Sequence, residues 1–149
     1  MGEWVEARTA TLCVSGVHAC RIADLPYWIG PELWEVELER VTEGDRKLVA
    51  ARGRLVRRIE AWDGGAKTGF AHDCASRVRA LADKATGARA EQLAAYAADA
   101  TANAERGEVA VLGYIAARAA EVDAGPEGYA AERAAQARWF ASELRLDAR

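Results

Sequence analysis

The sequence predicts an α+β fold, in which an N-terminal antiparallel sheet in residues 3–62 is covered by about four alanine-rich helices in residues 66–147. The composition changes near Asp63: β-branched and aromatic residues dominate before it, and Ala, Glu, Arg and Leu dominate after it. Runs of strands followed by runs of helices are typical of this class. A chain of 149 residues that is 51% hydrophobic has the size of one domain, so we expect residues 1–149 to form a single domain with its own core.

The clearest strand pair joins residues 34–39 to residues 47–62. Three apolar side chains alternate with three glutamates in the first segment, so one face should be buried and the other acidic. The second segment carries arginines on the face opposite its apolar residues. Since a slip of one residue would set apolar side chains against arginines, we expect a register in which Glu35 lies opposite Arg52 or Arg54.

The stretch before this hairpin has an expected strand and an expected helical turn. Residues 17–22 have the composition of a strand. Asp24 is placed to cap a short helical turn, which Gly30 would end in the left-handed conformation. The sequence Glu43-Gly44-Asp45 is expected to form the hairpin turn.

After Asp63, apolar residues recur at helical spacing, and glycines mark the ends of the helices. We expect four helices. The first carries the apolar stripe Phe70, Cys74, Val78, Leu81 and Ala85, and the second follows Gly87 over about residues 88–105. The third follows Gly107 and carries Leu112, Ile115, Ala119 and Val122, and the fourth extends from Pro126 to about Leu146.

The composition excludes several classes of protein. A net charge of −3 gives no basic surface for nucleic acid, and no apolar run reaches the ~20 residues of a membrane helix. The N-terminal MGEWVE has no features of a secretory signal. Three cysteines are an odd number, which argues against a disulfide framework, so we expect a reducing, cytoplasmic compartment.

The histidines and cysteines raise the question of a metal site. Zinc binds nitrogen and sulfur ligands, and on a strand His18 and Cys20 would share a face, near Cys13 in sequence. His72 and Cys74 would point in opposite directions on a helix. Because the spacing matches no standard zinc pattern, we expect no metal and no cofactor. A domain stabilised by a metal on Cys13, His18 and Cys20 stays as an alternative.

Four residues form the candidate pocket: His18, Cys20, Tyr27 and Trp28. Aromatic side chains line small-molecule sites as well as cores, and a histidine beside a cysteine can activate a thiolate. The leading hypothesis is a binding or protein-interaction module without chemistry of its own. The alternative is a small enzyme or small-molecule-binding protein that uses this pocket. A protein partner, a small molecule and a homo-oligomer are all compatible with the sequence.

Three blocks of the sequence carry a resemblance: SGVHACRIADLPYWIGPELWEVELE, GDRKLVAARGRLVRRIEAW and GYAAERAAQARWFASEL. They resemble a family of small uncharacterised proteins, mostly from actinobacteria, over nearly the whole chain after about Trp4. The chain is loosely similar as well to a domain of unknown function in phage and pentapeptide-repeat proteins. Members of the actinobacterial family often begin with an extra strand, so the resemblance implies that the first strand here is incomplete. It implies the same fold and no particular activity.

Overall fold

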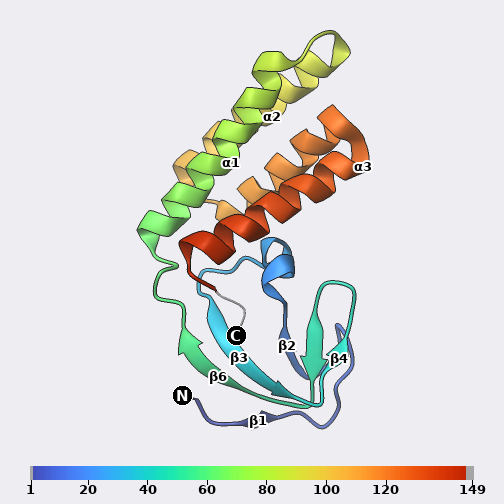
Figure 1. Ribbon diagram of the computed structural model, residues 1–149, viewed down its shortest axis with the longest axis vertical. Coiled ribbons are helices and arrows are strands. Elements are labelled where there is room, and N and C mark those ends of the chain that lie inside the picture. Colours follow the sequence, from blue (N-terminus) through green and yellow to red (C-terminus); the bar gives the residue numbers. More distant parts are fainter. Residues whose placement is uncertain (1, 147–149) are drawn as a thin grey trace.

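The structure is a computed structural model that describes residues 2–146 and confirms the α+β fold class (Figure 1). Two small antiparallel sheets lie at one end of the molecule and the helices at the other, with a short 3₁₀ helix between them. The elements are β1 (Val5–Glu6), β2 (Val17–Ala19), η1 (Ile22–Tyr27), β3 (Trp34–Glu39), β4 (Thr42–Glu43), β5 (Leu48–Ala50), β6 (Arg52–Arg58), α1 (Gly64–Lys84), α2 (Ala88–Arg106) and α3 (Val109–Glu143).

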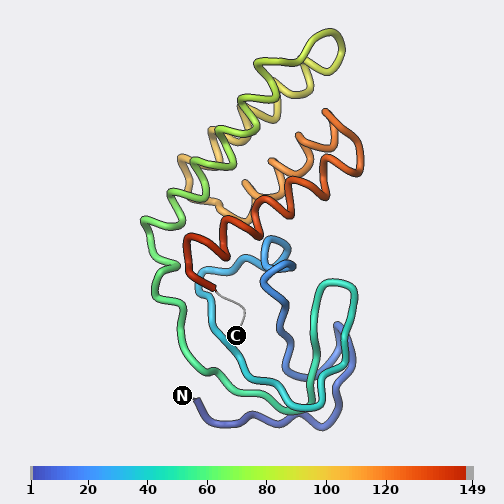
Figure 2. The backbone as a smooth tube through the Cα atoms, in the orientation of Figure 1, coloured from blue at the N-terminus to red at the C-terminus, as the bar shows by residue number. Residues whose placement is uncertain are grey.

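The expected long strand over residues 47–62 is bent into two shorter strands. β5 and β6 are separated only by Ala51, and they belong to different sheets with the orders β2-β5-β4 and β1-β6-β3. The backbone trace shows this bend where the two sheets meet (Figure 2). As a result, β2 and β3 both lie at the edge of a sheet, each with a partner on one side only.

The register between β3 and β6 differs from both expected registers. Glu37 lies opposite Arg54, and after a register shift Glu35 lies opposite Arg57 rather than Arg52 or Arg54. The turn explains the difference, because Gly44 N–H donates to the Lys47 carbonyl at 2.8 Å, further along the chain than the expected turn at Glu43–Asp45. The pairing of glutamates with arginines is nevertheless confirmed by the ion pairs of Glu35, Glu37 and Glu39.

The bend depends on a close approach at Gly53. A Cβ atom there would lie 2.7 Å from Leu38 Cδ2, 3.0 Å from Val17 Cγ1 and 3.2 Å from the Glu37 carbonyl oxygen. These distances leave no room for a side chain, so glycine at this position allows β6 to pack closely against β3 and against Val17 of β2. We infer that Gly53 sets how closely the two sheets meet.

The helical turn after β2 forms, but not with the expected ends. η1 begins after Arg21, which makes no side-chain capping bond, and Asp24 lies inside it. Gly30 does not adopt a positive φ. Pro26 lies within η1, where its missing N–H limits the hydrogen bonds available, and the turn closes with the Trp28 N–H on the Leu25 carbonyl at 2.9 Å. The expectations for Asp24 and Gly30 are therefore wrong.

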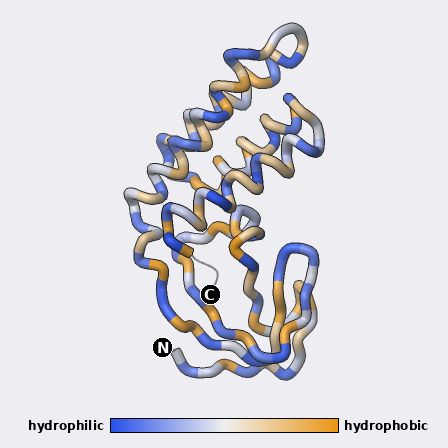
Figure 3. Tube along the Cα trace, in the orientation of Figure 1, coloured by the Kyte–Doolittle hydropathy of each residue, from blue (hydrophilic) through white to orange (hydrophobic). Residues whose placement is uncertain are grey.

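The helices begin and end close to the expected residues. Asp63 caps α1 by accepting a hydrogen bond from Ala66 N–H at 2.9 Å. α3 is interrupted at Ala124 and Gly125, where φ of the glycine is 71°, so that Pro126 begins a second helical half. The bundle thus contains four helical rods, and the hydropathy along the trace alternates as expected for amphipathic helices (Figure 3).

The main core lies within the bundle and includes residues from the β part. Phe70 and Phe140 pack with ring centroids 4.8 Å apart, and Trp62, which follows β6, lies 5.3 Å from Phe140. Leu33 and Ile59 belong to the same buried cluster. The helices meet the β part mainly through η1, which packs on α3 (Figure 1). Among the described residues, no helix has the length and apolar character needed to cross a membrane.

A charged network lies inside the bundle, which the sequence did not indicate. The Glu132 carboxylate is 8% exposed and accepts hydrogen bonds from Arg77 Nε at 3.0 Å and Nη2 at 2.9 Å. Gln136 Nε2 donates to the same carboxylate at 2.8 Å, and its Oε1 accepts from Arg133 at 3.1 Å. Since a buried charge is costly unless it is paired, this chain of contacts ties α1 to the second half of α3.

A candidate ligand-binding groove

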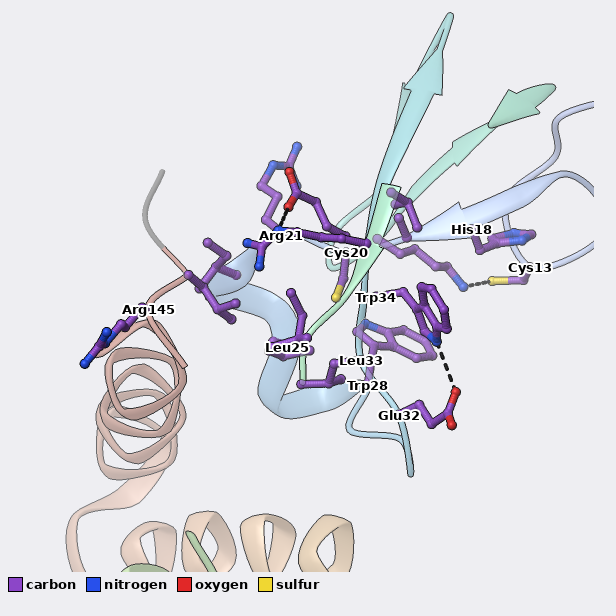
Figure 4. Close-up of a pocket in the computed structure, with 18 residues that line it drawn as sticks. Cys13, His18, Cys20, Arg21, Leu25, Trp28, Glu32, Leu33, Trp34 and Arg145 are labelled. Carbon is purple, nitrogen blue, oxygen red and sulfur yellow. Dashed lines mark hydrogen bonds and ion pairs between the residues drawn. The ribbon is translucent and has the colours of Figure 1, made fainter. Parts of the chain in front are cut away.

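A groove with a volume of about 990 Å³ opens between the edge strands β2 and β3 (Figure 4). Its walls come from η1, β2, β3, the segment after β6 and the last described residues. The apolar lining consists of Ile22, Leu25, Leu33, Val36, Ile59 and Leu146. The groove exists because the sheets bend apart at Ala51 and leave both strand edges facing the same space.

The structure brings three of the four candidate pocket residues to this groove. His18, Cys20 and Trp28 line it, and Figure 4 shows His18 beside Cys13 at one end of β2, with Cys20 nearer to η1. Tyr27 lines a different crevice, which opens toward α3. The consecutive residues Tyr27 and Trp28, at the end of η1, therefore line two different pockets.

The chemistry of Cys20 does not favour a nucleophile. Burial, together with the smaller effect of the nearby negative charge of Asp24, raises the pKa of its thiol to about 11. A catalytic cysteine needs its thiolate stabilised, which is the opposite shift. Within residues 2–146, no hydrogen bond joins His18 to a cysteine, and the His18 side chain is exposed. The arrangement lends no support to a Cys–His pair.

The residues of the proposed metal alternative do not converge either. In the described part of the chain, no three His, Cys, Asp or Glu side chains form a group that could hold a metal ion. Cys13 lies in a tight turn with φ of 64°, and its thiol contacts the ammonium of Lys47. A cation beside the sulfur disfavours a second cation at the same place.

Two tryptophans present their ring faces at the groove. Trp28 is 50% exposed and Trp34 is 42% exposed, which is high for such large apolar side chains. The indole N–H groups are already bound, that of Trp28 to the Arg46 carbonyl at 2.8 Å and that of Trp34 to Glu32 Oε2 at 3.1 Å. These hydrogen bonds hold both rings in place while about half of each side chain stays exposed.

The groove carries cations without a carboxylate partner. Arg57 is neutralised by Glu35 at 2.6 Å, and Arg21 pairs with a glutamate of β4. Lys47 and Arg145, in contrast, form no ion pair within residues 2–146. Lys47 Nζ lies 5.3 Å from the centroid of the Trp28 ring. Within residues 2–146 the site thus combines an apolar floor, two half-exposed indoles and two cations without a carboxylate partner.

Sequence reasoning missed Lys47, Trp34 and Arg145 as groove residues. The alternation in residues 34–39 indicated a sheet face for Trp34, and Lys47 stood at the start of the expected strand over residues 47–62 with no signal for a ligand site. Comparisons of the chain with protein-family models, with curated proteins and with solved structures found no match. The resemblance to the actinobacterial family accordingly stays a prediction.

Proposed function

We propose that this protein is a binding module that holds a flat, mainly apolar ligand with an anionic group in the groove between β2 and β3, without chemistry of its own. The observation that carries the proposal is the pair of exposed indoles, Trp28 and Trp34, beside the ammonium of Lys47, which contacts the Cys13 thiol and has no carboxylate partner within residues 2–146. Ligand sites are typically concave and apolar, with a few polar groups that fix orientation, and commonly have volumes of roughly 300–1,000 Å³. The raised pKa of Cys20 supports binding rather than catalysis.

A pair of matched dyes tests this proposal. The fluorescent probe 8-anilinonaphthalene-1-sulfonate has two aromatic groups and one sulfonate, and N-phenyl-1-naphthylamine is the same framework without the charge. We expect saturable binding of the sulfonate at one site per chain. Trp28→Ala should weaken it by about tenfold, because stacking on the indole is lost. Tyr114→Ala is the control, since Tyr114 is 53% exposed on α3 and outside the groove lining.

The charge contribution is tested with Lys47→Gln. This variant should bind the sulfonate more weakly and the uncharged naphthylamine as well as the parent protein does. Near-UV circular dichroism must be retained in every variant, because partly unfolded proteins bind the sulfonate dye as well. Equal binding by the parent protein, Trp28→Ala and Lys47→Gln would contradict the proposal.

The free strand edges favour a second candidate, an extended peptide that adds a strand to β3 or β2. Main-chain hydrogen bonds supply the affinity in such complexes. Peptides selected from a random display library should then lose binding when alternate amides are N-methylated. Peptides bound only through their aromatic side chains would keep their affinity and support the first candidate instead.

The proposal includes a reducing, cytoplasmic compartment. It is supported by the cysteines Cys13, Cys20 and Cys74, all of which are free thiols. Free-thiol titration of protein isolated under non-reducing conditions should find three thiols per chain after unfolding. A lower number would indicate oxidation and contradict this part of the proposal.

A further inference from the structure

A second crevice, of about 520 Å³, lies between η1, the tip of the β4–β5 hairpin and the second half of α3. Three arginines line it, Arg46 from the hairpin tip and Arg133 and Arg138 from α3, together with the ring of Tyr27. It is separate from the groove described above, and the two share only Ile22 among their lining residues.

Arg133 is the unusual member of this set. Its side chain is 5% exposed, and within residues 2–146 it forms no ion pair with a carboxylate. Its Nη1 donates to the Pro26 carbonyl at 3.0 Å and to Gln136 Oε1 at 3.1 Å. The other edge of the guanidinium, Nε and Nη2, meets only the Tyr129 hydroxyl, at 3.4 Å from each nitrogen. Hydrogen bonds to guanidinium groups are usually shorter, so this edge is poorly satisfied.

The positive charge is concentrated around one aromatic ring. The guanidinium carbon of Arg46 lies 4.1 Å from the centroid of the Tyr27 ring, and that of Arg133 lies 4.8 Å from it. Arg138, in the same crevice, forms no ion pair in the described part of the chain. Like charges that converge on one hollow repel each other, and an anion between them relieves that repulsion.

Two carboxylates line the crevice as well, but neither neutralises Arg133. Asp45 lies at the hairpin tip with its side chain 93% exposed, and its oxygen is 3.7 Å from Arg46 Nε. Asp24, whose side chain is 17% exposed, lies 3.7 Å from Arg21 Nη1. Against these two carboxylates the crevice holds three arginines, so its lining keeps a net positive charge.

We propose that this crevice binds an oxyanion, the phosphate or carboxylate group of a small ligand. A guanidinium is a bidentate donor that matches two oxygens of such a group, and Arg133, which has no carboxylate partner among residues 2–146, places one in the lining of the crevice. Arg46 and Arg138 flank the anion from the hairpin tip and from α3. The crevice is larger than the anionic group alone, and it leaves room for an organic body against Tyr27. This inference does not depend on the function proposed for the groove.

Isothermal titration calorimetry with two probes tests the site and separates the two chemistries. Pyrophosphate represents phosphate ligands and succinate represents carboxylate ligands, each titrated at the same low ionic strength set with chloride. Binding of one probe at one site per chain identifies the ligand class, and binding of both identifies a general oxyanion site. Either result supports the proposal. Absence of binding by both probes up to about 10 mM overturns it.

Charge-removing variants locate the site. Arg46→Gln and Arg138→Gln should each weaken binding by about tenfold, because each removes one charge-assisted contact. Arg79→Gln removes the same charge from an exposed position on α1 and should leave the affinity unchanged. Equal weakening in all three variants would reveal only a general charge effect and would overturn the proposal.

Arg133→Lys keeps the charge but loses the bidentate edge. It should weaken binding more than either exposed variant does, with a larger loss for the probe that binds tightest. If the buried substitution prevents folding, Arg46→Gln and Arg138→Gln still decide the outcome, since both residues lie at the surface.

Discussion

Replacing Gly53 by alanine tests the account of the bent sheet most directly. The added methyl would lie 2.7 Å from Leu38 Cδ2 and 3.0 Å from Val17 Cγ1, which are ends of flexible side chains. It would lie 3.2 Å from the Glu37 carbonyl oxygen, which belongs to the backbone of β3 and yields less easily. Overpacking of this kind typically costs ~1–3 kcal/mol. For a chain of 149 residues this corresponds to a decrease in Tm of about 3–10 °C.

The matched control makes the same chemical change where there is room. A Cβ at Gly69, in the exposed part of α1, would meet nothing closer than Trp139 Cζ2 at 3.7 Å. Gly69→Ala should therefore stabilise the protein by about 0.5–1 kcal/mol, because alanine favours the helix and restricts the unfolded chain. Urea unfolding followed by circular dichroism measures both variants. If Gly53→Ala were as stable as the parent protein, the close approach of β6 to β3 would be refuted.

Three further predictions concern buried and capping groups. Burial is the main cause that raises the pKa of Cys20 to about 11 and that of Cys74 to about 12, so the folded protein holds these thiol protons more tightly than the unfolded chain does. The stability that this contributes is complete below the ordinary thiol pKa of 9.0 and falls as the pH rises toward 11 and 12. Cys74→Ala should therefore reduce the loss of stability between pH 8 and pH 10, as measured by urea unfolding. Glu132→Gln should cost about 1–3 kcal/mol in the free energy of unfolding, because it removes the buried carboxylate that accepts from Arg77 and leaves this partly buried guanidinium with Asp73 as its charge partner. Glu37→Gln on the exposed sheet face should cost less than about 1 kcal/mol. Asp63→Ala should cost about 1 kcal/mol and increase amide hydrogen exchange in the first turn of α1, and unchanged exchange would argue against the cap.

The helical half was predictable because its signals are local. Glycines at positions 87, 107 and 125 adopt positive φ in the structure, and each lies at a helix boundary that the sequence marked. Alanine and the apolar stripe through Phe70, Cys74 and Val78 indicated which face is buried. Because the apolar pattern repeats at every helical turn, an error of one residue at a helix end does not change which face is assigned as buried.

The sheet was predictable only in part, because its geometry depends on non-local contacts. The alternation in residues 34–39 correctly paired glutamates with arginines, but the turn closes between Gly44 and Lys47, and this shifts every pair. The bend at Ala51 has no local sequence signal, and the close approach of Gly53 to Leu38 beside it joins residues far apart in the sequence. Because no sequence pattern indicates the bend, the groove beside it could not be predicted from the sequence either.

The candidate site shows the same division. Of the four residues that the sequence singled out, His18, Cys20 and Trp28 line the groove and Tyr27 lines the other crevice. The buried polar side chains of α3 were missed, because Glu132 and Arg133 stand at positions that have the composition of a solvated helix face. Only the packing of α3 against α1 and η1 shows that they are inside.

The tip of the β4–β5 hairpin has a consequence beyond its local contacts. Arg46 lies over the ring of Tyr27 in the crevice, and its neighbour Lys47 lies over the ring of Trp28 in the groove. The Arg46 carbonyl holds the Trp28 indole as well, so the tip forms a common wall between the two hollows. An occupant that displaces this wall on one side changes the shape of the other side. By thermodynamic linkage the effect is reciprocal, and each occupant would alter the affinity of the other by the same factor.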